Sequence, residues 1–234
     1  MFGRRLRIGL MVPSSNTTME PEFYQHLPEG VSLHTARMNI VQTTYEGLKA
    51  MSKDVERCAR LVATAGVNVV CYGCTTGSLL EGKGYDTALV DRIGKIVQAP
   101  VVATAPAVVE ALRGKGMKRL AIVTPYVKEL DEREAAYLED YGFEVLTIKG
   151  LGIVENLDIG KCEPSVAFRM GLEAIGEAPA ADGVFISCTN FRSFGIIQKL
   201  SEEIGKPVIS SNQASLWMTL KTGGVSASLE GLEC

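Results

Sequence analysis

The chain has 234 residues, of which 46% are hydrophobic and 22% are charged, an ordinary composition for a folded globular protein. Its formal net charge of −3 argues against nucleic acid as a partner, because phosphate binding needs a concentrated positive patch. No apolar run is long enough to span a bilayer, and the segment after Arg7 lacks the pattern of a secretory signal. We therefore expect a cytoplasmic protein with no membrane partner, whose cysteines are reduced thiols (58, 71, 74, 162, 188 and 234).

Short runs rich in β-branched residues alternate along the chain with amphipathic stretches, which is the pattern of a parallel α/β sheet. In the first half we expect strands at 8–13, 31–39, 67–73 and 100–104, and helices at 45–66 and 85–97. In the second half we expect strands at 120–125, 143–150, 183–187 and 207–210, and helices at 128–141, 164–175 and 194–204. Each half thus has a parallel sheet of about four strands flanked by helices.

The second half of the chain repeats the first. The matching segments are Ile8–Pro13 with Leu120–Pro125, Val69–Thr75 with Gly183–Thr189, and Pro100–Thr104 with Pro207–Ser211. Three matches in the same order and at similar spacing indicate two copies of one unit. We expect two pseudo-symmetric Rossmann-like halves with the active site in the cleft between them. The first half would comprise residues 1–106 and 208–234, and the second half residues 107–207.

Cys74 and Cys188 occupy matching positions in the two copies, each directly after a strand and each followed by a threonine. Because ligands of open parallel sheets bind beyond the carboxyl ends of the strands, a pseudo-twofold axis should bring the two thiols together. Backbone N–H groups and the helix dipole at such a position favour the thiolate, which is both a nucleophile and a base. Two thiols on opposite faces of one substrate can invert a stereocentre by proton transfer, or isomerise a double bond by addition, rotation and elimination.

Both reactions need donors that hold a carboxylate and stabilise developing negative charge. Hydroxyl, amide and backbone donors follow the same strands, at Ser14, Ser15, Asn16, Thr75, Thr76, Gly77, Ser78, Tyr126, Thr189 and Asn190. Structural interpretations stay open for several of these residues. Asn16 could only cap a helix, Tyr126 could be an interface aromatic, and either cysteine could be a small buried core residue.

Other chemistries fit the sequence less well. The Cys71-x-x-Cys74 spacing is shared with redox motifs, but Cys71 lies inside an apolar strand and is expected in the core. The chain has two histidines, His26 and His34, and neither accompanies a cysteine cluster, which disfavours a zinc site and a Ser-His-Asp or Cys-His hydrolase. We therefore expect no cofactor and no metal.

The segments Val12–Glu20, Tyr72–Ser78, Val123–Tyr126 and Ile186–Asn190 resemble the aspartate/glutamate racemase superfamily, in particular its branch of maleate cis–trans isomerases and arylmalonate decarboxylases. The resemblance implies two Rossmann-like halves, no cofactor and a pair of catalytic cysteines. Cys74 would be the thiolate that attacks or deprotonates, and Cys188 its partner acid and base. The substrate carboxylates would be held by Asn16, Thr75, Thr76, Tyr126, Asn156 and the backbone after Cys188.

Two departures from the family pattern bear on the substrate. The decarboxylases keep only the second cysteine, so Cys74 argues against simple decarboxylation. The maleate isomerases have an apolar run after the first cysteine. This chain has the hydroxyl-rich run 75–78 instead, which is closer to the sequences of the racemases and decarboxylases. We expect a cofactor-independent cis–trans isomerase of a small unsaturated dicarboxylate, of the maleate-to-fumarate type, working as a homo-oligomer (dimer or tetramer). The alternatives are an α-carbon racemase of an amino acid or a hydantoin, and a non-catalytic module that binds a small carboxylate.

Overall fold

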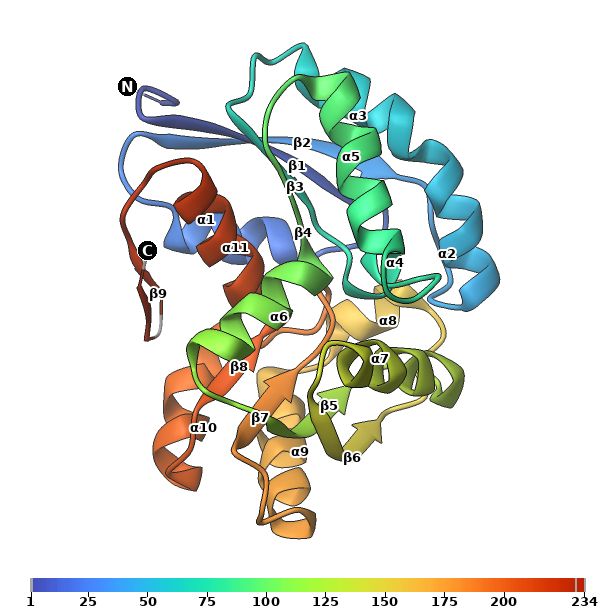
Figure 1. Cartoon of the computed structure of the whole chain (residues 1–234), viewed down its shortest axis with the longest axis vertical. Helices are drawn as coiled ribbons and strands as arrows, with labels where there is room; N and C mark the ends of the chain where they lie inside the picture. Colours follow the sequence, from blue (N-terminus) through green and yellow to red (C-terminus); the bar gives the residue numbers. More distant parts are fainter. Residues whose placement is uncertain (1, 230, 234) are drawn as a thin grey trace.

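The computed structural model describes residues 2–229 and 231–233, which form two four-stranded parallel sheets flanked by helices (Figure 1). The first sheet has the order β2-β1-β3-β4, with β1 (Leu6–Pro13), β2 (Val31–Met38), β3 (Val69–Tyr72) and β4 (Val101–Ala103). The second has the order β6-β5-β7-β8, with β5 (Arg119–Thr124), β6 (Glu144–Gly150), β7 (Gly183–Ile186) and β8 (Val208–Ser210). The two orders are equivalent, which confirms the predicted pair of pseudo-symmetric α/β halves.

Most predicted helices are present: α2 (Tyr45–Met51), α3 (Val55–Ala63), α5 (Tyr85–Val97), α7 (Lys128–Asp140), α9 (Pro164–Glu177) and α10 (Ile197–Ile204). The others are α1 (Met19–His26), α4 (Thr75–Ser78), α6 (Thr104–Gly114), α8 (Asn156–Lys161) and α11 (Ser211–Thr222). Short 3₁₀ turns span Ser52–Asp54 and Phe194–Ile196, and a terminal hairpin pairs β9 (Ser228–Leu229) with β10 (Leu232–Glu233). Within the described ranges, no helix combines the length and apolarity needed to cross a membrane.

The central strands form the core of each half. Every residue of β3 and β7 is buried, as expected for parallel strands covered by helices on both faces. The outer strand β6 is only partly buried along most of its length. The central strands are the ones that carry the two cysteines at their carboxyl ends, so the thiols project from the most rigidly held part of each sheet.

The sequence did not predict α4, α6, α8 or α11, and it predicted one helix where α2 and α3 are separate. The predicted single helix 45–66 breaks at Ser52–Asp54, where Ser52 Oγ donates to the Lys49 carbonyl and Asp54 accepts from the Asn39 N–H. Such local polar bonds compete with helical ones. Helix α6 was not predicted because Pro106 interrupts its pattern, yet a proline in the first turn removes only an N–H that has no helical partner.

Helices α6 and α11 lie side by side between the two sheets (Figure 1). Helix α11 packs on β3 and β4 of the first sheet, whereas α6 also packs on β8 of the second. Strand β8 pairs with β7, so residues 208–210 belong to the second sheet, although the predicted first half resumes at 208. We propose that the second half extends through Ser210 and that the chain returns to the first half with α11.

Candidate active site

A small closed cavity lies where the carboxyl ends of the central strands of both sheets meet. Its volume is about 10 Å³, room for about one water molecule. Its wall consists of Pro13, Ile40, Thr43, Leu48, Cys74, Thr75, Thr76, Tyr126, Asn156, Cys188 and Thr189. The structure thus brings both predicted cysteines and the predicted donors Thr75, Thr76, Tyr126, Asn156 and Thr189 to one cavity, from both halves of the chain.

Cys74 leaves β3 in an extended conformation (φ −150°) and caps the short helix α4. Its Sγ accepts a hydrogen bond of 3.3 Å from the Gly77 N–H, and the neighbouring Thr76 side chain also lowers its pKa. Residue 77 has to be glycine-sized, because a Cβ there would lie 2.9 Å from the Cys74 sulfur. The predicted donors are therefore present. However, burial outweighs them and raises the pKa of Cys74 to about 11, so the thiol is neutral in this closed state.

Cys188 occupies the matching position with a different backbone. Its φ of +92° lies in the left-handed region, which costs free energy for any residue with a Cβ. The turn is held by the Cys188 N–H, which donates to Ser211 Oγ (3.1 Å), and by the Asn190 N–H, which donates to Cys188 Sγ (3.3 Å). Burial is the main reason that the pKa of Cys188 is raised to about 12; the neighbouring Tyr126 side chain lowers it, and negative charge on Cys74 or Glu134 raises it.

Side chains on the wall connect the two halves. Thr75 Oγ1 donates to Ser211 Oγ (2.9 Å), so Ser211 joins the loop of Cys74 to the loop of Cys188. Thr189 Oγ1 donates to the Gly73 carbonyl (3.2 Å) and makes a second such bridge. Asn156 Nδ2 donates to Ser15 Oγ (2.8 Å). The wall geometry thus depends on contacts between residues far apart in the sequence.

Three predicted site residues lie behind the wall. Ser14 Oγ exchanges hydrogen bonds with the backbone of Ile40 (3.0 Å each). Asn16 Oδ1 accepts from the N–H groups of Thr18 and Met19, but the N-cap of α1 is Thr18, so Asn16 is not the helix cap; its Nδ2 donates to Thr189 Oγ1 (3.0 Å). Asn190 Nδ2 donates to the Asn156 carbonyl (2.6 Å). In this closed state these side chains hold the loops that carry wall residues.

Sequence reasoning did not single out Ser211 or the apolar wall of Pro13, Ile40 and Leu48. Ser211 follows β8 just as the predicted donors follow the other strands, and the internal repeat pairs it with Thr104. The strand-end argument applied to the fourth strand would have found it. The apolar residues carry no comparable sequence signal. Cys71 is buried inside β3, as predicted for a core residue, and Cys234 lies outside the described residues.

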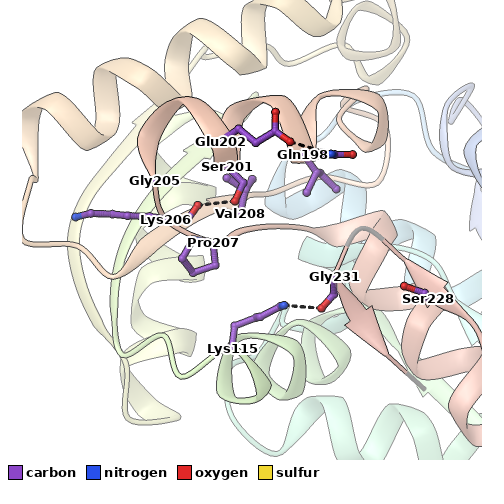
Figure 2. Close-up of a pocket in the computed structure, with 11 residues that line it drawn as sticks. Lys115, Gln198, Ser201, Glu202, Gly205, Lys206, Pro207, Val208, Ser228 and Gly231 are labelled. Atoms are coloured by element: carbon purple, nitrogen blue, oxygen red, sulfur yellow. Dashed lines mark hydrogen bonds between the residues drawn. The ribbon is translucent and has the colours of Figure 1, made fainter.

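A larger hollow of about 780 Å³ lies at the opposite, amino-terminal end of β8 (Figure 2). Its two lysines are already engaged, since Lys115 donates to the Gly231 carbonyl and Lys206 to the carbonyls of Pro179 and Ala181. None of the described residues that line it is a cysteine. The nucleophiles and the convergent donors are in the small cavity, which we take as the candidate active site.

Comparison with known proteins agrees with this site. A family model described as arylmalonate decarboxylase matches residues 8–233. The chain is 36% identical over 228 residues to a maleate isomerase of Pseudomonas putida, covering 92% of this chain and 90% of that protein. A solved maleate isomerase from Pseudomonas putida S16, a cysteine-to-alanine variant with maleate, has a TM-score of 0.91 at 29% identity and covers 98% of this chain and 96% of that one.

A second solved relative is the maleate cis–trans isomerase of Nocardia farcinica, a cysteine-to-serine variant with a covalently bound succinylcysteine intermediate. Its TM-score is 0.89 at 29% identity, covering 97% of this chain and 96% of that one. The predicted resemblance is confirmed over nearly the whole length. The chain belongs to the arylmalonate decarboxylase family.

Proposed function

We propose that this chain is a cofactor-independent cis–trans isomerase of a small unsaturated dicarboxylate, of the maleate-to-fumarate type. The observation that carries the proposal is the pair of thiols, Cys74 and Cys188, on the wall of one closed cavity. The maleate isomerases among its relatives support the same reaction. A succinylcysteine, as found in one of them, is the species formed when a cysteine adds across the double bond of maleate.

In the first step Cys74 gives up its proton to solvent while the halves are open, and the thiolate then forms a C–S bond to one alkene carbon. The electron pair of the double bond moves to the neighbouring carbon, where the adjacent carboxylate stabilises it as an enolate-like charge. Cys188 then delivers its proton to that carbon and is left as a thiolate. The product is a succinyl thioether on Cys74, in which the former double bond is single and can rotate.

The second step reverses the first from the rotated conformer. The Cys188 thiolate removes the proton, the double bond forms again in the trans geometry, and the C–S bond breaks to regenerate the Cys74 thiolate. No redox change and no net proton exchange is needed. Two thiols suffice, because one serves as nucleophile and leaving group and the other as acid and base.

The substrate carboxylates are held in this proposal by neutral donors on the wall: Thr75, Thr76, Tyr126, Asn156 and Thr189. The wall formed by the described residues carries no lysine or arginine. Ser14, Asn16 and Asn190 keep the donor loops in place. A cavity of about 10 Å³ has to widen to admit a four-carbon acid, so we expect the halves to open for binding and to close around the substrate, which excludes water from the carbanion-like intermediate.

The alternatives are weaker. Simple decarboxylation leaves Cys74 without a role. Racemisation at an α-carbon fits two opposed thiols chemically, but the maleate isomerases among the relatives favour the isomerase. A module that only binds a carboxylate leaves unexplained why both thiols line the cavity.

The test is incubation of the purified protein with maleate, with fumarate measured by NMR and Cys74→Ala as the control. We expect fumarate from the unaltered protein and none from the variant. The proposal is wrong if maleate is unchanged while the protein exchanges the α-hydrogen of aspartate, glutamate or a hydantoin with solvent deuterium. We further propose that the enzyme is cytoplasmic, where its thiols stay reduced, and that it is a homo-oligomer; a monomeric mass by light scattering would contradict the latter.

A further inference from the structure

One face of helix α1 lies along the segment 189–194, which directly follows the second cysteine. At the start of the helix Thr18 Oγ1 donates to the Asn190 carbonyl (2.9 Å). At its end the ring of His26 stacks on the ring of Phe194, with 3.8 Å between the ring centroids. Helix α1 belongs to the first half and the segment to the second, so this contact joins the two halves beside the candidate active site.

Glu22 lies midway between these two contacts, on the same face of α1, because residues four apart share one side of a helix. Its Oε1 accepts from the backbone N–H groups of Ser193 (3.0 Å) and Phe194 (3.2 Å). Its Oε2 accepts from Asn212 Nδ2 (2.6 Å), and the same nitrogen donates to the Thr189 carbonyl (3.1 Å). The carboxyl group therefore holds one end of the segment directly and the other end through Asn212.

The three groups that contact the Glu22 oxygens are all donors. The Thr189 carbonyl can only accept, so the Asn212 atom beside it is the amide nitrogen, and Glu22 needs no proton of its own to make these bonds. Burial raises the pKa of Glu22 above its ordinary value, and the hydrogen bonds from the three donors oppose that rise. Ser193, Phe194 and Asn212 are buried. Without the carboxylate these donors would lose an acceptor in the interior, and the segment would have to move to regain one.

The segment held by Glu22 continues directly from the strained turn at Cys188. This turn has φ of +92°, and its sulfur accepts from the Asn190 N–H (3.3 Å). Ser211 accepts from the Cys188 N–H, and the next residue, Asn212, donates to the Thr189 carbonyl. A backbone conformation that costs free energy persists only where its surroundings over-determine it. The position of the Cys188 sulfur therefore depends on the contacts after the turn as well as on Ser211.

We propose that Glu22 is a positioning residue for Cys188, which holds the segment 189–194 and thereby keeps the Cys188 turn in its left-handed conformation. The catalytic consequence rests on the proposed isomerase function, in which Cys188 gives a proton to one substrate carbon and takes it back. Such a transfer needs the sulfur within reach of that carbon. Glu22 is not among the residues that line the cavity, so it affects this step only through the turn.

The first experiment asks whether Glu22 maintains the turn, and it needs no isomerase activity. Glycine at position 188 should give a more stable protein than alanine, because φ of +92° suits a residue without a Cβ. We expect this advantage, measured by urea unfolding of Cys188→Gly and Cys188→Ala, to disappear when Glu22→Ala is added, because the turn can then relax to negative φ. Glu22→Gln keeps the size of the side chain but directs an amide at Asn212, and it should reduce the advantage even if Glu22→Ala does not fold.

Asp86→Asn is the matched control for the first experiment. Asp86 is another buried carboxylate of the first half that accepts from the second half, from the hydroxyls of Tyr137 (2.7 Å) and Tyr141 (2.6 Å). The advantage of glycine should be unchanged in this background. The proposal is overturned if the advantage is undiminished in every Glu22 variant that folds, if Asp86→Asn removes it equally, or if the unaltered protein lacks it.

The second experiment measures the consequence for the reaction. Glu22→Ala should lower kcat by about 10²-fold, as expected when a reacting group is displaced by about 1 Å, whereas Asp86→Asn should leave kcat unchanged. Incubation of Glu22→Ala with maleate should still give an adduct on Cys74 by intact-protein mass, because the three partners of Glu22 described above lie outside the Cys74 loop. Loss of the adduct together with the activity, or an equal loss of activity in Asp86→Asn, contradicts the proposal. If the unaltered protein isomerises nothing, the proposed function is wrong, and the comparison of glycine with alanine still decides the role of Glu22.

Discussion

The loops of Cys74 and Cys188 occupy matching positions in the two halves but have different surroundings. Both follow a central strand, and both sulfurs accept one backbone N–H at 3.3 Å. Cys74 has an extended backbone and lies near the Tyr72 hydroxyl, which has no hydrogen-bond partner among the described residues. Cys188 has a strained backbone, and the residue before it, Ser187, donates to the buried carboxyl group of Glu134. The repeat places the two thiols at matching positions, and the proposed roles, addition for Cys74 and proton transfer for Cys188, assign a different task to each environment.

The largest effect should come from exchanging each thiol for a hydroxyl. Cys74→Ser should lower activity by more than about 10⁴-fold, because a serine hydroxyl without a base is a poor nucleophile. Cys188→Ser should lower it by about 10²- to 10⁴-fold and still form an adduct with maleate on Cys74. Rates and intact-protein mass after incubation with maleate measure both. An adduct in Cys74→Ser, or none in Cys188→Ser, would reverse the assigned roles.

The buried carboxyl group should give the second half a pH dependence of stability that the Cys74 loop lacks. The pKa of Glu134 is about 8 in the folded chain and 4.5 in its ordinary state, so the native state binds more protons between these values and stability falls as pH rises. Glu134→Gln removes this loss of stability, which amounts to about a few kcal/mol of unfolding free energy. Urea unfolding measures this effect. The free energy of unfolding of the variant, relative to that of the unaltered protein, should be higher at about pH 8 than at about pH 5. If the two proteins differ in unfolding free energy by the same amount at both pH values, the carboxyl group is ionised in the folded chain.

Removing the Ser211 hydroxyl, which joins the two cysteine loops, should destabilise both loops. Ser211→Ala leaves the buried Cys188 N–H without its acceptor, at a cost of about 1–3 kcal/mol, and releases Thr75. We expect kcat/KM to fall by about 10-fold as the thiols lose their relative position. Ser215→Ala, one turn further along α11, is the control because its hydroxyl bonds to Ser211 O and Thr104 away from the wall. Equal loss of activity in both variants would argue that only the stability of α11 matters.

The smallest effect tests the backbone difference directly. At position 188, glycine should give a more stable protein than alanine by about 1 kcal/mol, because φ of +92° suits a residue without a Cβ. At position 74, where φ is −150°, alanine should be the more stable of the two by about 0.5–1 kcal/mol. Urea unfolding of Cys188→Gly, Cys188→Ala, Cys74→Gly and Cys74→Ala measures the four values. If the same residue, glycine or alanine, gives the more stable protein at both positions, backbone strain does not distinguish the two loops.

The sequence by itself determined the two-sheet fold of this protein and the location of its candidate site. Strand periodicity and the internal repeat predicted two parallel sheets, because both depend on local patterns that the chain carries twice. The strand-end rule applied to the repeat singled out Cys74 and Cys188 from six cysteines, and it also predicted Thr75, Thr76, Tyr126 and Thr189 on what is now the wall.

Only the tertiary structure decided what those residues experience. The N–H donors around Cys74 were predictable, but the burial that raises its pKa to about 11 is a sum over residues from both halves. Ser211 and Glu134 reach the cysteine loops across long sequence separations, from a helix that crosses between the sheets and from one packed on β6. The left-handed turn at Cys188 is held by a bond to Ser211. Local patterns place residues on elements, whereas the solvation and backbone strain of those residues depend on what the completed fold packs against them.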